Sequence, residues 1–180
     1  MIHREKLKVT EMNRLSTEAY KAAEKTPLTI VLDNVRSLHN VGSVFRTADA
    51  FLAEKIYLCG ITSTPPNAEL HKTALGAEFS VDWEYAEDTL KVVERLKSEG
   101  YIVLAIEQAK GSTLLEELTL EKGKKYAVVL GNEVKGVQQS IVDQSDLCVE
   151  IPQYGTKHSL NVSVTAGIII YKLATTLMRF

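Results

Sequence analysis

Short apolar runs alternate with longer amphipathic segments along most of the chain. The runs predict strands at 28–32, 55–59, 101–106, 126–130 and 147–151, with a weaker one at 81–83. Their continuous Val, Ile and Leu content indicates burial on both faces of a sheet. The amphipathic segments predict helices at 10–24, 41–52, 86–99, 138–143 and 162–178. This alternation is typical of an α/β fold in which helices flank a mainly parallel sheet.

The last predicted helix carries apolar side chains around most of its circumference. They are Val162, Val164, Ile168, Ile169, Ile170, Tyr171, Leu173, Ala174, Leu177 and Met178. Because one face of a helix cannot bury all of these side chains, we expect the core on one side and a second subunit on the other. The sequence therefore predicts a subunit interface on this helix.

The chain is long enough for one sizeable hydrophobic core. It has 180 residues, and 45% of them are hydrophobic. Pro27 cannot continue the first predicted helix, so we expect a helical extension over residues 1–26 and a single domain over residues 27–180. The Pro-rich segment 62–66 is interpreted as a surface loop inside this domain, because strand-like segments continue on both sides of it.

The charge balance limits how the protein can bind nucleic acid. Lys and Arg number 21 against 23 Asp and Glu, a net charge of −2, so any nucleic-acid site has to be a local basic patch. The segment from Glu78 to Glu99 is acidic, and we expect that face to repel RNA. Basic residues gather in small groups elsewhere, and solvated surface is the simplest interpretation of each group alone.

Several classes of protein are excluded by the absence of their motifs. The glycine spacing contains neither G-x-G-x-x-G nor a phosphate loop, and no zinc-ligand or serine-hydrolase pattern occurs. Cys59 and Cys148 each lie in an apolar stretch without metal-ligand spacing, which is typical of a reduced cytoplasmic protein. We also expect no metal ion and no membrane segment.

Three polar clusters remain, each where a predicted strand gives way to a loop, at 34–48, 130–137 and 151–163. In the first, Arg46 lies opposite the apolar stripe of its helix, so it either points into a cleft or is an ordinary exposed arginine. In the second, Gly131 either lets a ligand approach main-chain amides at the carboxyl edge of the sheet or belongs to a simple turn. In the third, Ser159 or Asn161 either binds a ligand or merely caps the last helix.

In their order and separation, these clusters resemble the three motifs of the SpoU (TrmH-like) branch of the SPOUT RNA methyltransferases. The likeness extends over about residues 28–177. The matching residues are Asn40, Gly42, Arg46, Thr47 and Ala48 in the first motif, Gly131, Glu133 and Gly136 in the second, and Ser159, Leu160, Asn161 and Ser163 in the third.

Two features bear on the target of such an enzyme. Gly-Asn-Glu combined with Ser-Leu-Asn-Val is most similar to the tRNA guanosine-18 type. The chain departs from the family pattern at Leu52, where the family commonly has Gly, and at Asn132 and Val134, which replace the commoner Ser and Gly. These departures concern the choice of target more than the chemistry.

The resemblance implies transfer of a methyl group from S-adenosylmethionine to a ribose 2′-hydroxyl of tRNA or rRNA by a homodimer. It also implies the SPOUT fold, a parallel sheet whose C-terminal segment forms a trefoil knot, an exception to the rule against knotted chains. The cofactor would lie in the knot. The implied cofactor-binding residues are Ile106, Leu130, Gly131, Asn132, Gly136, Ile151, Ser159 and Leu160.

The resemblance further implies catalytic and RNA-binding residues. Arg46 would stabilise charge on the ribose oxygen, because a guanidinium stays protonated. Asn40, Ser159 and Asn161 would orient the ribose or Arg46, and Glu133 would hold the motif loops or a polar group of the substrate. We expect salt-dependent RNA binding at Arg36, His39, His71, Lys72, Lys157 and His158.

Two other functions stay open on the sequence alone. One is a non-catalytic RNA-binding or assembly protein that keeps the same fold, and the other is an unrelated α/β enzyme acting on a small molecule. The joint presence of Arg46, Glu133 and Asn161 favours an RNA methyltransferase over the binding protein, because binding alone does not need such a constellation.

Overall fold

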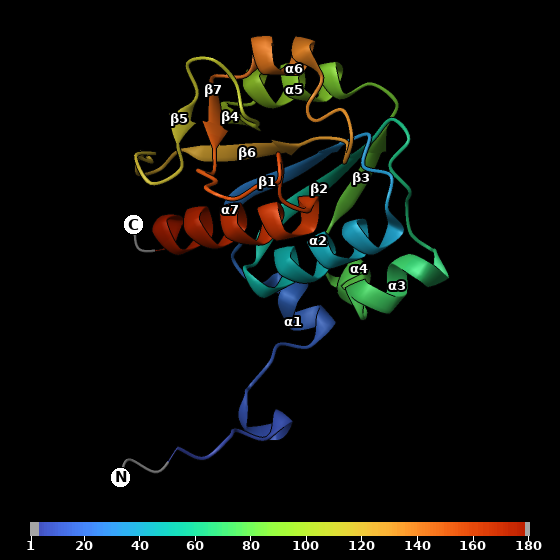
Figure 1. Cartoon of the computed structure of the whole chain (residues 1–180). Coiled ribbons are helices and arrows are strands. Elements are labelled where there is room, and N and C mark those ends of the chain that lie inside the picture. Colours follow the sequence, from blue (N-terminus) through green and yellow to red (C-terminus); the bar gives the residue numbers. More distant parts are fainter. Residues whose placement is uncertain (1–3, 179–180) are drawn as a thin grey trace.

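A single parallel sheet forms the centre of the computed structural model, which describes residues 4–178. Within these residues the strand order is β3-β2-β1-β6-β4-β7-β5, and every neighbouring pair is parallel (Figure 1). The prediction of a mainly parallel sheet is therefore confirmed. The strands are β1 (Thr26–Asp33), β2 (Ala53–Cys59), β3 (Trp83–Ala86), β4 (Tyr101–Ile106), β5 (Thr113–Leu114), β6 (Lys125–Leu130) and β7 (Leu147–Glu150).

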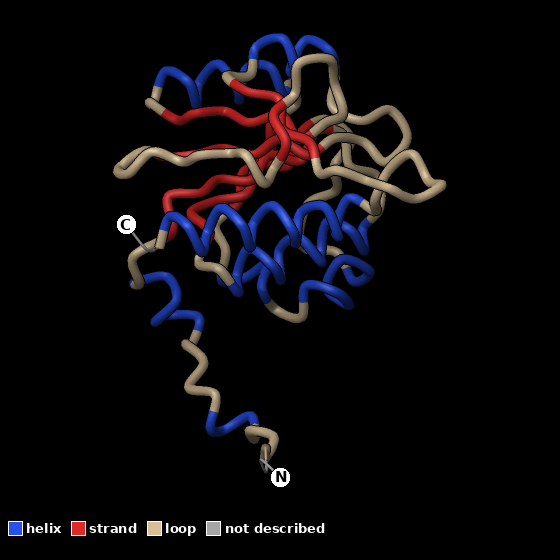
Figure 2. Tube along the Cα trace, turned by 60° about the vertical axis from the view of Figure 1, so that its left-hand side comes forward, coloured by secondary structure: helices blue, strands red, loops and turns tan. Residues whose placement is uncertain are grey.

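Helices cover both faces of this sheet (Figure 2). One face is covered by α5 (Thr89–Ser98) and α6 (Gln139–Gln144). The other is covered by α2 (Leu38–Ala50) and α7 (Val162–Leu177). Three short helices pack beyond α2, namely α1 (Thr17–Ala22), α3 (Ala68–Ala74) and α4 (Ala77–Ser80). The arrangement is the helix-sheet-helix layering expected from the alternating pattern.

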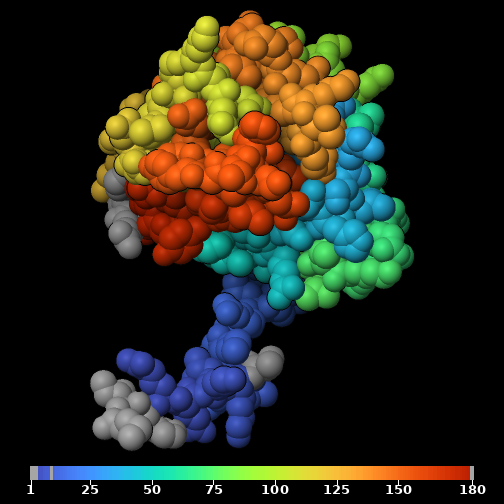
Figure 3. All heavy atoms as spheres, in the orientation of Figure 1, coloured from blue at the N-terminus to red at the C-terminus, as the bar shows by residue number. Residues whose placement is uncertain are grey.

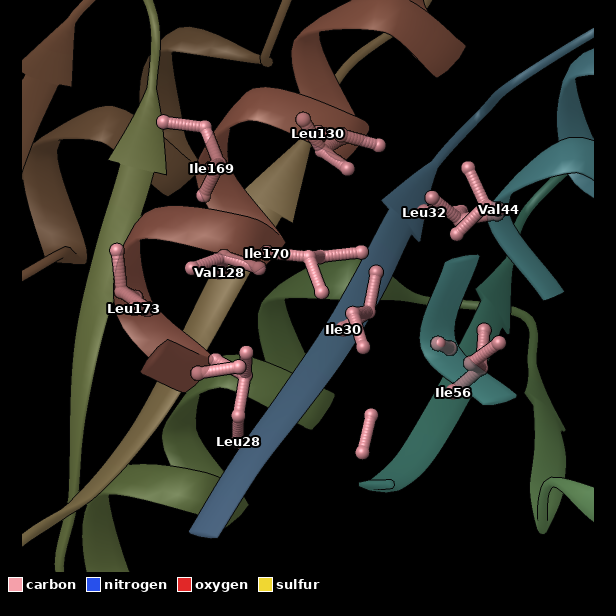
Figure 4. Packing of buried hydrophobic residues seen from close by; sticks show 14 of the residues in the cluster. Leu28, Ile30, Leu32, Val44, Ile56, Val128, Leu130, Ile169, Ile170 and Leu173 are labelled. Carbon is pink, nitrogen blue, oxygen red and sulfur yellow. The ribbon is translucent and has the colours of Figure 1, made fainter. Parts of the chain in front are cut away.

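The larger hydrophobic core lies between the sheet and α7. Side chains of α7 lie over side chains of the central strands (Figure 4). A fully buried Leu or Ile side chain stabilises a fold by about 1.5–3 kcal/mol, so this layer holds α7 firmly against the strands. The side chains concerned are Ile169, Ile170 and Leu173 of α7 and Leu28, Ile30, Val128 and Leu130 of the sheet.

The outer side of α7 is apolar as well, as its composition indicates. Val164, Ile168 and Tyr171 keep 51%, 37% and 60% of their surface exposed. The prediction that one side of this helix packs against the core is thus confirmed. Contact of its exposed side with a second subunit stays a prediction. Neither α7 nor any other helix within residues 4–178 is long and apolar enough to cross a bilayer.

Helix α2 has the predicted amphipathic arrangement. Its buried stripe includes Val44 and Phe45, whereas Arg46 is exposed on the other side. The helix begins earlier than predicted because the Ser37 hydroxyl accepts a hydrogen bond of 3.3 Å from the Asn40 main-chain N–H. Beyond its end, Leu52 has a φ of 52°, a left-handed conformation that favours glycine.

The N-terminal helix is shorter than predicted. The prediction of one continuous helix over residues 10–24 is wrong. A short 3-10 turn covers Val9–Glu11, Asn13 interrupts the chain with a φ of 47°, and Ser16 then caps α1. Tyr20 is buried and anchors α1 on the domain. The segment before α1 stands out from the rest of the molecule (Figure 3).

Two unpredicted helices and two displaced boundaries correct the sequence predictions. Helices α3 and α4 were not predicted, because both are too short to show a helical period. The weak strand predicted at 81–83 is displaced, since β3 begins only at Trp83. The predicted helix start at 86 is also wrong, because Ala86 belongs to β3 and the Asp88 carboxylate caps α5, accepting a hydrogen bond of 2.8 Å from the Leu90 N–H.

Candidate functional site

The carboxyl ends of parallel strands meet at one edge of a sheet, and the polar clusters follow these ends. The segment after β4, the turn after β6 and the loop between β7 and α7 lie side by side on one face of the molecule (Figure 3). Open α/β sheets bind their ligands at this edge. The fold therefore gathers segments that are far apart in the sequence.

A cavity of about 920 Å³ opens among these segments. Its walls combine main-chain groups of the turn at 131–137 with apolar side chains, a mixture typical of small-molecule sites. Glu133, Asn161 and His158 also line it. All of the residues expected to bind the cofactor line it too, namely Ile106, Leu130, Gly131, Asn132, Gly136, Ile151, Ser159 and Leu160.

Glu133 lies where the turn after β6 meets the start of α2. Its Oε2 accepts a hydrogen bond of 2.9 Å from the Arg36 N–H. Its Oε1 accepts hydrogen bonds of 2.9 Å from the Ser37 N–H and from Nδ2 of Asn40. Burial alone would raise the pKa of Glu133, but the hydrogen bonds from Arg36, Asn40 and Ser37 outweigh it and lower the pKa. The carboxylate is thus a charged clamp on the first motif.

Asn40 joins this clamp to the third motif. It is buried, and its Oδ1 accepts a hydrogen bond of 3.2 Å from Nδ2 of Asn161. Asn161 also caps α7, since its Oδ1 accepts a hydrogen bond of 2.9 Å from the Ser163 N–H. Asn161 therefore caps the helix through its oxygen and joins the network through its amide group, and binding of a ligand by Asn161 stays a prediction.

The turn between Gly131 and Gly136 is closed by its own hydrogen bonds. The Gly136 N–H donates to the carbonyl of Asn132 (2.8 Å), and the Asn132 N–H donates to the carbonyl of Gly136 (3.1 Å). A Cβ at Gly131 would overlap the main chain of Gly136 and Val137. The packing of this turn therefore requires glycine at 131, and binding of a ligand by its main chain, which lines the cavity, stays a prediction.

Arg46 does not line the cavity of its own protomer. It is exposed on α2, and no hydrogen bond or ion pair of its guanidinium occurs within residues 4–178. Asn40, six positions earlier on the same helix, belongs to the network beside the cavity. The structure therefore brings together Asn40, Glu133, Ser159 and Asn161 of the predicted catalytic residues, but not Arg46.

The expected RNA-binding residues fall into two groups. Arg36, Lys157 and His158 are exposed near the cavity. The other three are paired with glutamates. Glu69 lies 3.7 Å from His39 and 2.7 Å from Lys72, and Nδ1 of His71 lies 2.5 Å from Oε1 of Glu78. The basic character of this second group is thus partly offset by its own neighbours.

The acidic face expected over 78–99 needs one correction at its start. Glu78 is only 6% exposed, because its carboxylate turns inward to His71 and accepts a hydrogen bond of 3.0 Å from the Gly76 N–H. Glu84 does lie near the surface, but it pairs with Lys55 and Arg95. The side chains that could repel RNA therefore begin beyond Glu78.

Among the cavity residues that sequence reasoning missed are Glu107 and Gln108. Nε2 of Gln108 donates a hydrogen bond of 2.8 Å to the carbonyl of His158, which ties the end of β4 to the loop before α7. Both residues directly follow a predicted strand, and this position in the sequence was the signal that could have revealed them. Within residues 4–178, no cluster of three or more His, Cys, Asp or Glu could hold a metal ion.

The chain matches a known family of RNA-modifying proteins. Residues 27–171 match the model of the SpoU rRNA Methylase family. The chain belongs to the SpoU rRNA methylase family. The matched range contains all three motifs and every strand of the sheet except the first residue of β1.

Individual members of the SpoU family are similar at moderate identity. The chain is 31% identical over 166 residues to the 23S rRNA (guanosine-2′-O-)-methyltransferase RlmB of Nitrosomonas europaea, covering 91% of this chain and 63% of that protein. The crystal structure of the A. aeolicus TrmH/SpoU tRNA modifying enzyme matches with 29% identity and a TM-score of 0.76, covering 88% of this chain and 79% of that chain.

A solved methyltransferase structure with a bound cofactor also matches. It is the AdoMet-bound rRNA methyltransferase from Sinorhizobium meliloti, at 27% identity and a TM-score of 0.78, covering 88% of this chain and 60% of that chain. The present chain spans about 60% of the length of the curated relatives it matches. The likeness therefore concerns the domain that carries the cavity.

Proposed function

We propose that this protein is an S-adenosylmethionine-dependent methyltransferase that modifies a ribose 2′-hydroxyl of tRNA or rRNA. The observation that carries the proposal is the hydrogen-bonded chain from Glu133 through Asn40 to Asn161, which joins all three motifs beside one cavity. RNA binding alone does not require such a network. The names of the similar proteins, which are methyltransferases of 23S rRNA or modify tRNA, support the same function.

S-adenosylmethionine suits the chemistry of the cavity. Main-chain groups near Ile106, Gly131, Ile151 and Leu160 can hold an adenine, and the apolar side chains beside them can cover its faces. When bound, the cofactor supplies a methyl group on a sulfonium, and because the sulfonium loses its charge on transfer, no metal is needed. Our proposal includes the trefoil knot in the C-terminal segment, which contributes the loop at 151–161 to the cavity.

The protein has to stabilise charge on the attacking ribose oxygen. In our proposal Arg46 does this as a permanent cation, since a guanidinium does not lose its proton at neutral pH. Because Arg46 does not line the cavity of its own protomer, we propose that it acts at the cavity of a second subunit. Asn40, Ser159 and Asn161 orient the ribose, and Glu133 holds the first motif in place.

The proposed homodimer uses the exposed apolar side of α7. A groove of about 660 Å³ lies there between the loop after β7 and α7, lined by Pro152, Tyr154, Ile168 and Tyr171. Burying these side chains against a second copy removes apolar surface from water. Since α7 packs on α2, the same association brings a second subunit close to the helix that carries Arg46.

RNA contacts are proposed around the cavity and along α3. Arg36, Lys157 and His158 are exposed beside the cavity, and His39, His71 and Lys72 extend this surface along α2 and α3. Such contacts act on phosphates, so binding weakens as salt rises. Both cysteines are free, which agrees with a reducing compartment, and we place the protein in the cytoplasm.

Methyl transfer with isotope-labelled cofactor tests the proposal directly. The purified protein is incubated with methyl-labelled S-adenosylmethionine and total RNA from cells that lack the gene. We expect label in RNA as a 2′-O-methyl nucleotide, at a position that is unmethylated in those cells and methylated in the wild type. Cofactor binding without any methylated RNA would instead indicate an RNA-binding protein that has kept the fold.

A further inference from the structure

At the end of β4, the carboxylate of Glu107 lies in the cavity, and none of the three motifs predicts it. Glu107 directly follows the strand and lines the cavity together with Gly131, Gly136 and Leu160. Its main chain is fixed, because its N–H donates a hydrogen bond of 3.1 Å to the carbonyl of Val149. The side chain therefore projects from a rigid element rather than from a flexible loop.

Main-chain donors fix the carboxylate of Glu107 in one orientation. Its Oε2 accepts a hydrogen bond of 2.9 Å from the Val137 N–H, and its Oε1 accepts one of 2.9 Å from the Gln108 N–H. The turn packs closely on it, since a Cβ at Gly136 would overlap the same carboxylate. Glu107 thus joins the end of β4 to the turn after β6, the two walls of the cavity.

These contacts leave acceptor capacity unused. An ionised carboxylate has about four lone-pair sites on its two oxygens, and only two are occupied by the Val137 and Gln108 amides. No Lys, Arg or His forms an ion pair with Glu107 within residues 4–178. A ligand group that faces Glu107 has to be a hydrogen-bond donor, because a second acceptor would be repelled.

We propose that Glu107 binds the ribose hydroxyls of the cofactor's adenosine. This inference rests on the proposed function, in which adenine lies against the main chain of Ile106, the residue before Glu107. The ribose is the next group after adenine, and its two adjacent hydroxyls match the two free acceptor sites. An acidic side chain plays the same part toward a ribose in other α/β folds.

The chemistry of methyl transfer favours the ribose over the sulfonium as the partner of Glu107. A carboxylate against the sulfonium would stabilise a positive charge that disappears in the reaction, and this would oppose transfer. Hydrogen bonds to the ribose hydroxyls are the same before and after transfer. Glu107 is therefore a binding residue that holds the adenosine without slowing the chemical step.

Calorimetry with S-adenosylhomocysteine and its 2′-deoxy and 3′-deoxy counterparts tests the assignment. A hydrogen bond to a charged group contributes about 1.5–3 kcal/mol, so the wild type should bind at least one deoxy compound about 10-fold to 100-fold more weakly. Glu107→Gln should bind S-adenosylhomocysteine more weakly by a similar factor and should discriminate much less against that deoxy compound. Glu117→Gln, a change at an exposed glutamate outside the cavity, should behave as the wild type does.

The possible results separate the three explanations. If Glu107→Gln weakens all compounds equally, the carboxylate only supports the turn and the proposal is wrong. If the variant loses affinity for S-adenosylhomocysteine but not for 5′-methylthioadenosine, which lacks the ammonium group, Glu107 faces the amino-acid end and the proposal is also wrong. Equal affinity of the wild type for S-adenosylhomocysteine and both deoxy compounds would also overturn the proposal, even if the variant does not fold. Failure of the wild type to bind any of these compounds would overturn the proposed function itself.

Discussion

Nδ2 of Asn40 donates a hydrogen bond of 2.9 Å to Oε1 of Glu133, across 93 positions of the sequence. Asn40 belongs to the first turn of α2, and Glu133 belongs to the turn after β6. The same asparagine accepts a hydrogen bond from Asn161 at the start of α7. The position of each motif relative to the cavity thus depends on the other two.

Glu133→Gln should destabilise the protein at neutral pH. The carboxylate accepts three hydrogen bonds, and an amide cannot accept all of them because its nitrogen is a donor. We expect the free energy of unfolding to fall by about 1.5–3 kcal/mol, the contribution of a hydrogen bond to a charged group. Urea denaturation at pH 7 measures this change, with Glu117→Gln as a control at an exposed site.

The difference between wild type and Glu133→Gln should depend on pH. The pKa of Glu133 is lowered in the folded protein, so its charged form stabilises the fold fully above the ordinary glutamate pKa of about 4.3. This stabilisation is lost as the pH falls through the lower folded pKa. We expect the unfolding free energies of the two proteins to converge below about pH 4. A difference that stays constant down to the acid transition would contradict stabilisation of the fold by the charged carboxylate of Glu133.

Arg46→Ala should leave the fold and cofactor binding intact and lower methyl transfer by about two to three orders of magnitude, as expected when an oxyanion stabiliser is lost. Arg46 is exposed and does not line the cavity of its own protomer, which is why folding and cofactor affinity should not change. Single-turnover transfer of labelled methyl groups measures the effect. Near-normal turnover would remove Arg46 from the chemistry.

Mixing two impaired variants, at a cofactor concentration too low to saturate Glu107→Ala, tests whether Arg46 acts across the dimer. Arg46→Ala subunits keep an intact cavity, and subunits with Glu107→Ala keep Arg46 but have an altered cavity. If Arg46 acts on the partner's cavity, mixed dimers regain part of the activity, because one of their two sites contains both intact elements. Absence of any rescue in verified mixed dimers would show that Arg46 acts within its own subunit.

Gly131→Ala should damage the cavity, whereas Gly155→Ala should not. A Cβ at Gly131 would overlap the main chain of Gly136 and Val137, while nothing lies within 4 Å of the Cβ position at Gly155. We expect Gly131→Ala to lower the free energy of unfolding by about 1–3 kcal/mol, as overpacking does, and to weaken binding of S-adenosylhomocysteine. Thermal unfolding and calorimetry of the two variants provide the comparison, and equal behaviour of both would argue against a tightly packed turn.

Ile168→Glu should separate the proposed dimer into monomers. Ile168 lies on the exposed side of α7 and lines the apolar groove, so a charge there would be buried without a partner on association. Sedimentation or light scattering should show a fall in mass by half, whereas Lys91→Glu on the outer side of α5 should not change the mass. A wild type that is monomeric at micromolar concentration would contradict the proposed interface.

Much of the fold follows from local patterns in the sequence. The runs at 101–106 and 126–130 are strands because continuous apolar segments of this length pack on both sides of a sheet. Parallel strands end at the same edge of the sheet, and the second and third polar clusters, which follow such strands, line one cavity there. The apolar stripe of α2 likewise predicted that Val44 faces the core and that Arg46 lies on the opposite side of the helix, where it is exposed.

The tertiary structure alone decided which side chains became partners. Glu78 looks like surface charge in the sequence but is buried against His71, and Glu107 belongs to no motif but holds the turn after β6 through the Val137 amide. The short helices α3 and α4 also depend on packing against α2. Hydrophobic periodicity is a property of neighbouring residues and can be read locally, whereas a hydrogen bond between distant residues depends on the register and packing of the whole sheet, which no local pattern contains.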